Sequence, residues 1–318
     1  MTHWLSTYGF LIVSMTLGAL LALSLYLPFM SGQLSLASPG FYAIGGYIAA
    51  ILSTRVFSAV TPYPLWCMAV ELVLAVVCCG LLGWGIGVPV LRLRGIYFAI
   101  ATIALVEVLR VLALNLEITG GAIGIFGVPQ PFREPLGYLW LTLPLLVVVA
   151  IAIGRLEHSR PGQAMQAIRA DELVATTLGI DATRYKVLGF TLGAMLAGVA
   201  GVLSAHLLNT WNPRQGTFDT GIIALTAVLI GGNRTFVGAV VGGMVFTALP
   251  ELLRGLADQP QLPTAIAAFL RDGRMILYGG LIVLGTCFFP QGVCQPPRWR
   301  QLQSGLRVWR HIRKDLLH

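Results

Sequence analysis

Long apolar runs separated by short polar turns dominate this chain. The clearest are Gly9–Met30, Leu65–Val88, Gly137–Gly154, Leu188–Leu208, Phe236–Leu253 and Met275–Phe289, and another apolar run follows Gly95. A helix needs about 20 apolar residues to cross a bilayer, so most of these runs predict membrane spans. The pattern predicts an all-α polytopic membrane protein with about eight transmembrane helices, or about 8 to 10 with broken or re-entrant segments counted.

Composition agrees with a membrane protein. Hydrophobic residues make up 56% of the chain and charged residues only 11%, whereas soluble globular domains carry about 25% charged residues. The first run, Gly9–Met30, is preceded by no lysine or arginine. Because a signal peptide has a basic leading region and a shorter apolar core, we expect a retained helix here.

Two apolar runs, Phe41–Leu52 and Ile222–Ile230, are too short to be ordinary spans, and each is preceded by glycine. The first belongs to Ser31–Leu52, which opens with the polar sequence SGQLS, and the second follows a polar turn that starts at Asn209. We expect broken or re-entrant helices, because irregular backbone persists at membrane depth only where protein or a wet cavity covers it. A surface loop is the alternative for Ser31–Leu52. Paired broken segments also indicate an internal repeat of the kind found in transporters.

One polar stretch, Arg155–Lys186, interrupts the apolar pattern. It holds nine charged residues, while residues 137–154 before it hold none, and the tail 293–318 holds six basic residues and one acidic residue. Lysine and arginine accumulate in cytoplasmic loops. We therefore expect a single transmembrane domain over residues 1–292, with the loop 155–186 and the basic tail both in the cytoplasm.

The polar stretch also carries helix signals. Ser159 with Pro161 is typical of a helix start, and Gly179 is typical of a stop before a new helix. These signals predict one short amphipathic helix, in which Arg169 and Glu172 pair at i, i+3. Its apolar positions recur at helical spacing: Ala164, Ile168, Ala175 and Leu178.

Two interpretations of this helix remain open. It lies in the membrane interface, as lipid-bound amphipathic helices do, or it is a contact for a soluble partner. The small residues Gly162, Ala164 and Ala167 favour the partner, because they permit close approach and because a lipid-binding helix carries large apolar residues and lysines.

Motifs for catalysis are absent from the sequence. No phosphate-binding loop GxxxxGK[ST] occurs, and neither of the two lysines, Lys186 and Lys314, follows such a loop. No HExxH or GxSxG motif occurs, and the five cysteines form no CxxC, so we expect no metal site and no disulfide. The chain is predicted to be neither an enzyme nor a nucleic-acid-binding protein.

Several short motifs closely resemble the LivM-type permeases of branched-chain amino-acid ABC transporters. They span almost the whole chain in the family's order: Gly32–Leu36, Leu93–Ala99, Glu107–Arg110, Thr119–Gly121, Gly162–Glu172 with Leu178–Ile180, Gly231–Gly232, Leu249–Arg254 and Phe289–Gly292.

The resemblance implies a permease subunit of an importer in the bacterial inner membrane. A periplasmic binding protein would deliver branched-chain or other hydrophobic amino acids. The partners would be two ATP-binding cassette subunits, which use ATP and Mg²⁺, and a second permease subunit, either LivH-like or another copy. This chain would bind no cofactor itself. The loop that couples it to the ATPases would use Gly162, Ala164, Ala167, Arg169, Glu172 and Gly179.

If the chain is such a permease subunit, five residues are candidates for the substrate path: Gly32, Gln33, Ser35, Gly40 and Gly45. The alternative is that the glycines only allow close helix packing. Arg110 and Arg254 are candidates for docking the binding protein, and the alternative is local pairing with Glu107 and Glu251.

A different function class also stays open. A self-sufficient secondary transporter or channel needs charged residues at the bilayer centre, and Glu71 is the candidate for that role. The sequence does not choose the solute among leucine-like residues, other amino acids, amides and urea-like molecules. After Leu36 this chain has Ala37, Ser38 and Pro39, where the family commonly has Gly and then His or Gln.

Overall fold

The structure is a computed structural model that describes residues 2–57, 63–93, 95–132 and 134–257, together with 279, 280 and 283. These ranges are almost entirely helical. The elements follow in this order: α1 (Thr2–Phe29), α2 (Ser38–Ile51), the π-helical turn η1 (Leu52–Val56), α3 (Leu65–Val90), α4 (Ile96–Asn115), η2 (Glu117–Thr119), β1 (Ile125–Phe126), η3 (Pro135–Tyr138), α5 (Leu139–His158), α6 (Arg160–Ala170), α7 (Glu172–Thr177), α8 (Ala182–Leu208), β2 (Thr210–Trp211), α9 (Phe218–Gly232) and α10 (Phe236–Ala257).

Five of the described helices are long and apolar enough to cross a membrane: α1, α3, α4, α5 and α8. Each contains one of the long apolar runs of the sequence. The helices α2 and α9 are apolar but shorter, and in α10 the apolar stretch Phe236–Leu252 is also shorter. The prediction of an all-α polytopic membrane protein is confirmed. The predicted span Met275–Phe289, apart from 279, 280 and 283, and the tail 293–318 lie outside the described residues.

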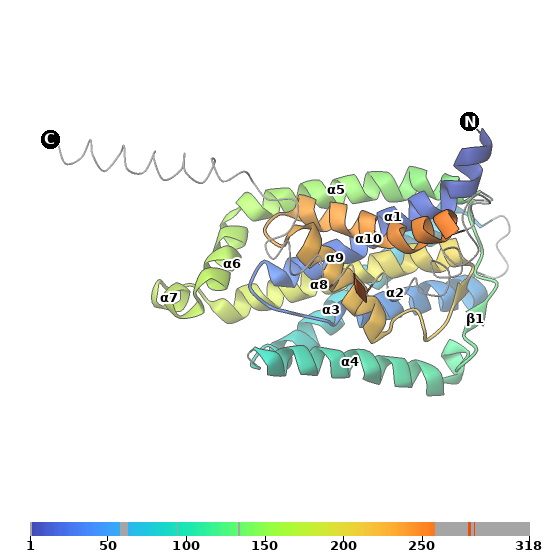
Figure 1. Cartoon of the computed structure of the whole chain (residues 1–318). Helices are drawn as coiled ribbons and strands as arrows, with labels where there is room; N and C mark the ends of the chain where they lie inside the picture. Colours follow the sequence, from blue (N-terminus) through green and yellow to red (C-terminus); the bar gives the residue numbers. More distant parts are fainter. Residues whose placement is uncertain are drawn as a thin grey trace.

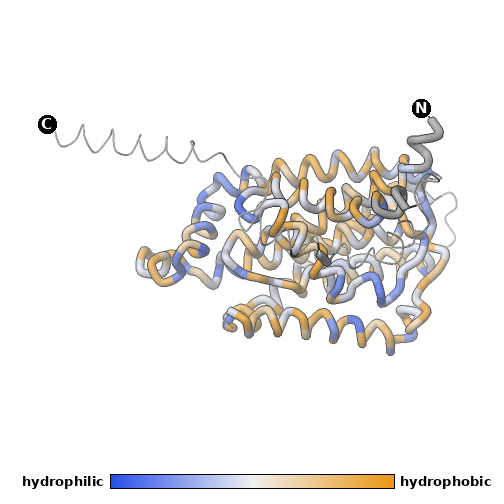
Figure 2. The backbone as a smooth tube through the Cα atoms, viewed as in Figure 1, coloured by the Kyte–Doolittle hydropathy of each residue, from blue (hydrophilic) through white to orange (hydrophobic). Residues whose placement is uncertain are grey.

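Successive long helices run between two ends of the bundle (Figure 1). At one end, which we call the α6–α7 end, α5 turns into α6 and α7, and these project beyond the other helices. At the opposite end, the hairpin end, β1 pairs antiparallel with β2, with Ile125 opposite Trp211. Figure 2 shows polar residues gathered in α6–α7 and in loops at the hairpin end, while the long helices are largely apolar.

The helices α1 and α8 form the centre of the bundle. In the most apolar stretch of each helix, 61% of the residues are buried in α1 and 78% in α8. The same share is 33% in α3 and 22% in each of α4 and α5. These two helices pack against each other, and α1 also contacts α9 and α10 while α8 contacts α2 and α3. The exposed apolar faces of α3, α4 and α5 therefore point outward, as expected for surfaces that meet lipid or another membrane protein.

The chain unwinds before each of the short helices α2 and α9. Residues 31–37 lead from α1 into α2, and residues 212–217 lead from β2 into α9. The chain comes together where α2 and α9 begin: a Cβ on Gly216, just before α9, would lie 2.7 Å from the carbonyl oxygen of Pro39 in the first turn of α2, and one on Gly221 in α9 would lie 3.0 Å from the Pro39 ring. A long helix, an unwound segment and two further helices thus occur twice, once from each end of the bundle, which agrees with the predicted internal repeat.

Protein covers alternate residues of the unwound segment before α2. Ser31, Gln33 and Ser35 are only 2%, 7% and 3% exposed, whereas Gly32 and Leu34 are exposed. The Leu36 amide donates to Thr102 Oγ1 of α4 at 3.1 Å, and the Ala37 amide donates to Ser35 Oγ at 3.3 Å. The surface-loop alternative is therefore wrong, because these backbone groups are buried and bonded inside the protein.

Glycines allow the short helix α2 to lie directly on α8. A Cβ on Gly45 would overlap the backbone of Gly198, and a Cβ on Gly46 would overlap the Trp211 ring. A Cβ on Gly40 would crowd Leu109 of α4 at 2.9 Å. The structure therefore places Gly40 and Gly45 in helix contacts, which is the packing role that the sequence left open for them.

We predict that Gly45→Ala lowers the stability of the protein by about 1–3 kcal/mol, because the added methyl group must push α2 away from α8. Gly85→Ala is the matched control, since Gly85 is also inside a long helix but a Cβ there meets nothing within 4 Å. Thermal unfolding in detergent should show a loss for Gly45→Ala and no loss for Gly85→Ala. Equal midpoints for both variants would contradict the close contact.

Candidate functional site

The α6–α7 end is built by helix caps that the sequence predicts. Ser159 caps α6 by accepting from the Gly162 amide at 3.4 Å, and Pro161 lies in its first turn. Gly179, with φ +84°, ends the loop before α8, whose first turn is capped by Asp181. These predicted start and stop signals are confirmed.

The predicted single amphipathic helix is wrong, because the chain breaks at Asp171. Asp171 has an extended φ of −158° and caps α7, accepting from the Leu173 and Val174 amides at 2.9 and 3.1 Å. Glu172 therefore starts a new helix and does not lie one turn from Arg169. It pairs with Lys186 of α8 at 2.7 Å, so the expected Arg169–Glu172 pair is also wrong.

The small residues of this loop face the protein itself. Gly162, Ala164 and Ala175 are buried, Ala167 is partly buried, and a Cβ on Gly162 would overlap the Leu156 carbonyl of α5. They permit α6 and α7 to fold back onto α5 and α8, where Ile168, Ala175 and Ala182 form a small cluster.

Large apolar side chains are exposed at the same end. Leu173 and Leu178 are each 75% exposed and Val174 is 51% exposed. The sequence pattern had placed Leu178 on the buried face and had not singled out Leu173 or Val174. The break at Asp171 changes which positions face outward, and the spacing of apolar residues does not reveal such a break.

Arg169 joins α6 to the C-terminal ends of α1 and α9. Its Nη1 donates to the Asn233 carbonyl, just after α9, at 2.7 Å, and its guanidinium lies 4.7 Å from the Phe29 ring centroid at the end of α1. A Cβ on Gly32, whose φ is +78°, would lie 3.2 Å from the Arg169 Cα. Burial lowers the pKa of the Arg169 guanidinium, which nevertheless stays charged at neutral pH.

Glu157, near the end of α5, makes a similar connection. It is 8% exposed, and its Oε1 accepts from Tyr26 Oη of α1 at 2.5 Å and from the Phe236 amide of α10 at 3.0 Å. In the sequence, Glu157 is only one of the nine charges in the polar stretch. Its partners lie 131 and 79 residues away, so local pattern could not identify them.

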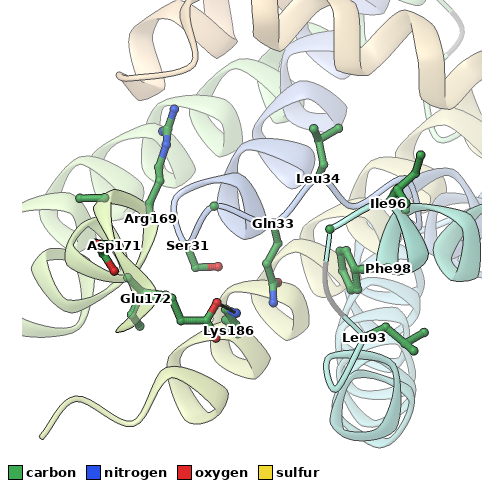
Figure 3. A pocket seen from close by; sticks show the side chains of 15 residues that line it. Ser31, Gln33, Leu34, Leu93, Ile96, Phe98, Arg169, Asp171, Glu172 and Lys186 are labelled. Atoms are coloured by element: carbon green, nitrogen blue, oxygen red, sulfur yellow. Dashed lines mark ion pairs between the residues drawn. The ribbon is translucent and has the colours of Figure 1, made fainter. Parts of the chain in front are cut away.

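A cavity of about 650 Å³ lies between α6–α7, the unwound segment before α2 and the start of α4 (Figure 3). Its lining contains Gly32 and Gln33 from the predicted path and Arg169 and Glu172 from the predicted coupling loop. The predicted substrate path and the predicted coupling loop, which sequence motifs indicate as separate sites, therefore line the same cavity. The remaining lining residues are Ser31, Leu34, Leu93, Gly95, Ile96, Phe98, Ala99, Ile168, Ala170, Asp171 and Lys186.

Gln33 is the unusual residue of this cavity. Its Oε1 is buried and has no hydrogen-bond partner among the described residues. In Figure 3 the side chains of Gln33 and Lys186 point into the same space, while Arg169 points away from Gln33. A buried polar atom without a partner costs free energy, so an amide kept here is a candidate to bind a polar group that enters the cavity.

The other predicted path and docking residues lie elsewhere. Ser35 is outside the cavity lining and accepts from the Ala37 amide. Arg110 pairs with Glu107 at 2.8 Å on the half-exposed face of α4, which is the local pairing that the sequence left open. Arg254 lies in α10, and its side chain is outside the described residues.

Comparisons with known proteins agree with this architecture. A family model described as the permease component of the branched-chain amino acid transport system matches residues 7–284. The high-affinity branched-chain amino acid transport system permease protein LivM of Salmonella typhimurium is 32% identical over 309 residues, covering 87% of this chain and 67% of the relative. LivM of Escherichia coli is 32% identical over 297 residues, covering 83% and 64%.

This chain thus spans about two thirds of the length of these LivM relatives. LivH of Salmonella typhimurium is 36% identical over 107 residues, covering 34% of each chain. No solved structure matches the chain. Because the family model covers most of the sequence, including both broken helices and the α6–α7 end, the chain belongs to the family of permease components of branched-chain amino acid transport systems.

Proposed function

We propose that this chain is the membrane permease subunit of an ATP-driven importer for branched-chain or other hydrophobic amino acids. The observation that carries the proposal is the α6–α7 end, which projects from the bundle and is bonded to the ends of α1, α9 and α10. A force applied to this projection reaches both broken helices. The solute class comes from the family and its named relatives.

The energy would arrive through α6 and α7. Two ATP-binding cassette subunits would bind and hydrolyse ATP with Mg²⁺, and their contact would include the exposed Leu173, Val174 and Leu178. Closure of the ATPases would shift α6–α7, and Glu157 and Arg169 would carry the shift to α1, α9 and α10 as a rigid-body motion. In this proposal the α6–α7 end would lie in the cytoplasm and the hairpin end on the periplasmic side of the bacterial inner membrane.

A second permease subunit would complete the translocation path. It would be LivH-like or a second copy of this chain, seated against one of the exposed apolar faces, while lipid covers the rest. A periplasmic binding protein would dock at the hairpin end, where Arg110 and Arg254 would contribute charge to the contact.

The solute would leave through the cavity at the α6–α7 end. Gln33 would bind a polar group of the amino acid, and Gly32 would keep the unwound backbone close to the coupling loop. Ser35, Gly40 and Gly45 would support this segment through packing contacts outside the cavity.

Glu71, the residue that the secondary-transporter alternative relied on, is paired with His206 at 2.6 Å.

The double variant Leu173→Asp/Leu178→Asp tests the ATPase contact. We expect the ATPase subunits to bind about thirtyfold more weakly, because about 2 kcal/mol of apolar contact is lost. The measurement is copurification from detergent-solubilised membranes. Ile123→Asp is the matched control, since Ile123 is 74% exposed but lies toward the hairpin end. Unchanged copurification of the double variant would remove this contact from the proposal.

The ion pair between α7 and α8 gives a second test. Glu172→Lys should lower the rate of amino-acid uptake about fivefold, because like charges then separate α7 from α8 at a partly exposed site worth about 1 kcal/mol. The double reversal Glu172→Lys/Lys186→Glu restores opposite charges and should recover most of the rate. Failure of the double reversal, with protein levels unchanged, would show that the pair itself is not the cause.

Gln33→Leu separates a solute contact from a structural role. Replacing the unpartnered amide should leave thermal stability unchanged or raise it, yet raise the KM for uptake about tenfold if Gln33 bonds the solute. Tyr47→Phe is the matched control, because the Tyr47 hydroxyl is also buried without a partner in the described part of the chain but lies outside the cavity lining. A KM for Gln33→Leu equal to that of Tyr47→Phe would contradict the assignment.

A further inference from the structure

A buried cluster of polar side chains lies at the hairpin end, far from the cavity. Glu71 of α3 and His206 of α8 are both 0% exposed, and Glu71 Oε2 lies 2.6 Å from His206 Nε2. Tyr63, just before α3, donates its hydroxyl to Glu71 Oε1 at 2.5 Å. Two ionisable groups removed from water in an apolar protein are costly unless each is paired, and here each is.

The hydrogen bonds settle how many protons the pair holds. His206 Nδ1 lies 2.8 Å from the Pro129 carbonyl oxygen, which can only accept, so Nδ1 carries a hydrogen. One more proton must lie between Glu71 Oε2 and His206 Nε2, because two lone pairs would otherwise face each other at 2.6 Å. On either atom, that proton leaves the pair with no net charge. The pair is therefore a neutral hydrogen-bonded unit that fits an apolar interior.

Residues from three segments converge on this pair, and two of them, Pro129 and Tyr138, lie 77 and 68 residues from His206. Tyr63 reaches Glu71 from the segment before α3, Pro129 reaches the His206 ring from the loop after β1, and Tyr138 of η3 donates to the His206 carbonyl at 3.1 Å. The Tyr63 ring also lies 5.4 Å from the His206 ring. Glu71 and His206 thus bind the segments that form the surface of the hairpin end to the two helices α3 and α8.

The loop held by Pro129 carries an exposed aromatic side chain. Phe126 is 62% exposed in β1, and β1 itself pairs with β2 just after α8. Its neighbour Val128 is fully buried, and the Val128 amide donates to the Asn209 carbonyl at 3.1 Å. The loop therefore presents Phe126 outward while its other side is fixed to the end of α8, in the manner of a preorganised contact surface.

We propose that Glu71 and His206 are positioning residues that hold the hairpin end as one rigid receiving surface for the protein that delivers the solute. The inference rests on the proposed function for what the surface receives. The preorganisation itself does not, because it follows from contacts within this chain.

Three variants separate positioning from packing. Glu71→Gln keeps the geometry of the neutral unit, since the Gln amide donates to His206 Nε2 and its oxygen accepts from Tyr63. Glu71→Leu removes the partner of a buried imidazole and should lower the unfolding midpoint by about 5 °C or more. Glu71→Leu/His206→Phe makes both positions apolar, which restores stability in most buried pairs, but it leaves Pro129 and Tyr63 without their partners.

The first readout uses the full chain alone in detergent. Amide hydrogen exchange over residues 126–132 should match the wild type in Glu71→Gln and be at least about tenfold faster in both Leu-containing variants. If both the exchange rate and the unfolding midpoint of the apolar double variant return to the wild-type values, the pair contributes only packing and does not position the loop. Exchange in Glu71→Gln as fast as in Glu71→Leu would overturn the neutral hydrogen-bonded unit.

The second readout is uptake by the assembled transporter in proteoliposomes, as a function of binding-protein concentration. The apolar double variant should raise the half-saturating concentration at least about fivefold while the maximal rate changes less than about twofold. Fast exchange with an unchanged half-saturating concentration would overturn the receiving role. Uptake that does not depend on a binding protein in the wild type would instead count against the proposed function and leave the exchange result standing.

Discussion

The architecture depends on one constraint: backbone that leaves a helix inside an apolar environment must be covered and hydrogen-bonded by protein. Here the chain unwinds at residues 31–37 and 212–217, and the starts of the two helices that follow, α2 and α9, pack together at Pro39. The cover requires close helix contact, which glycine provides where α2 crosses α8 at Gly45. The central position of α1 and α8 follows, because each leads into one of the unwound segments and both must stay protected.

Two side chains, Arg169 and Glu157, connect the bundle to its projecting α6–α7 end. Arg169 contacts the end of α1 and the turn after α9, and Glu157 contacts α1 and the start of α10. The segment from Glu157 to Arg169 therefore contacts both α1, which leads toward α2, and the junction between α9 and α10. The cavity beside it lies where a small movement of α6–α7 relative to residues 31–37 would change the size of an opening.

Several buried or partly buried polar side chains in this apolar chain join elements that are distant in sequence. Glu157 and Arg169 do this at the α6–α7 end, and Glu71 with His206 does it at the hairpin end. Each is paired, as the cost of burying polar groups demands. Gln33 differs because its oxygen has no partner among the described residues, and this difference makes the cavity a candidate for binding a solute.

The sequence by itself determined the features that depend on neighbouring residues: the long spans, the breaks before α2 and α9, and the caps at Ser159, Gly179 and Asp181. Length, periodicity and capping act within a few residues, so one sequence is enough to read them. Tertiary structure alone decided that Glu172 meets Lys186 and not Arg169, and that Gly45 packs on Gly198. It also brought Glu71 to His206 across 135 residues. These pairings depend on which helices become neighbours, and that is set by the packing of the whole chain.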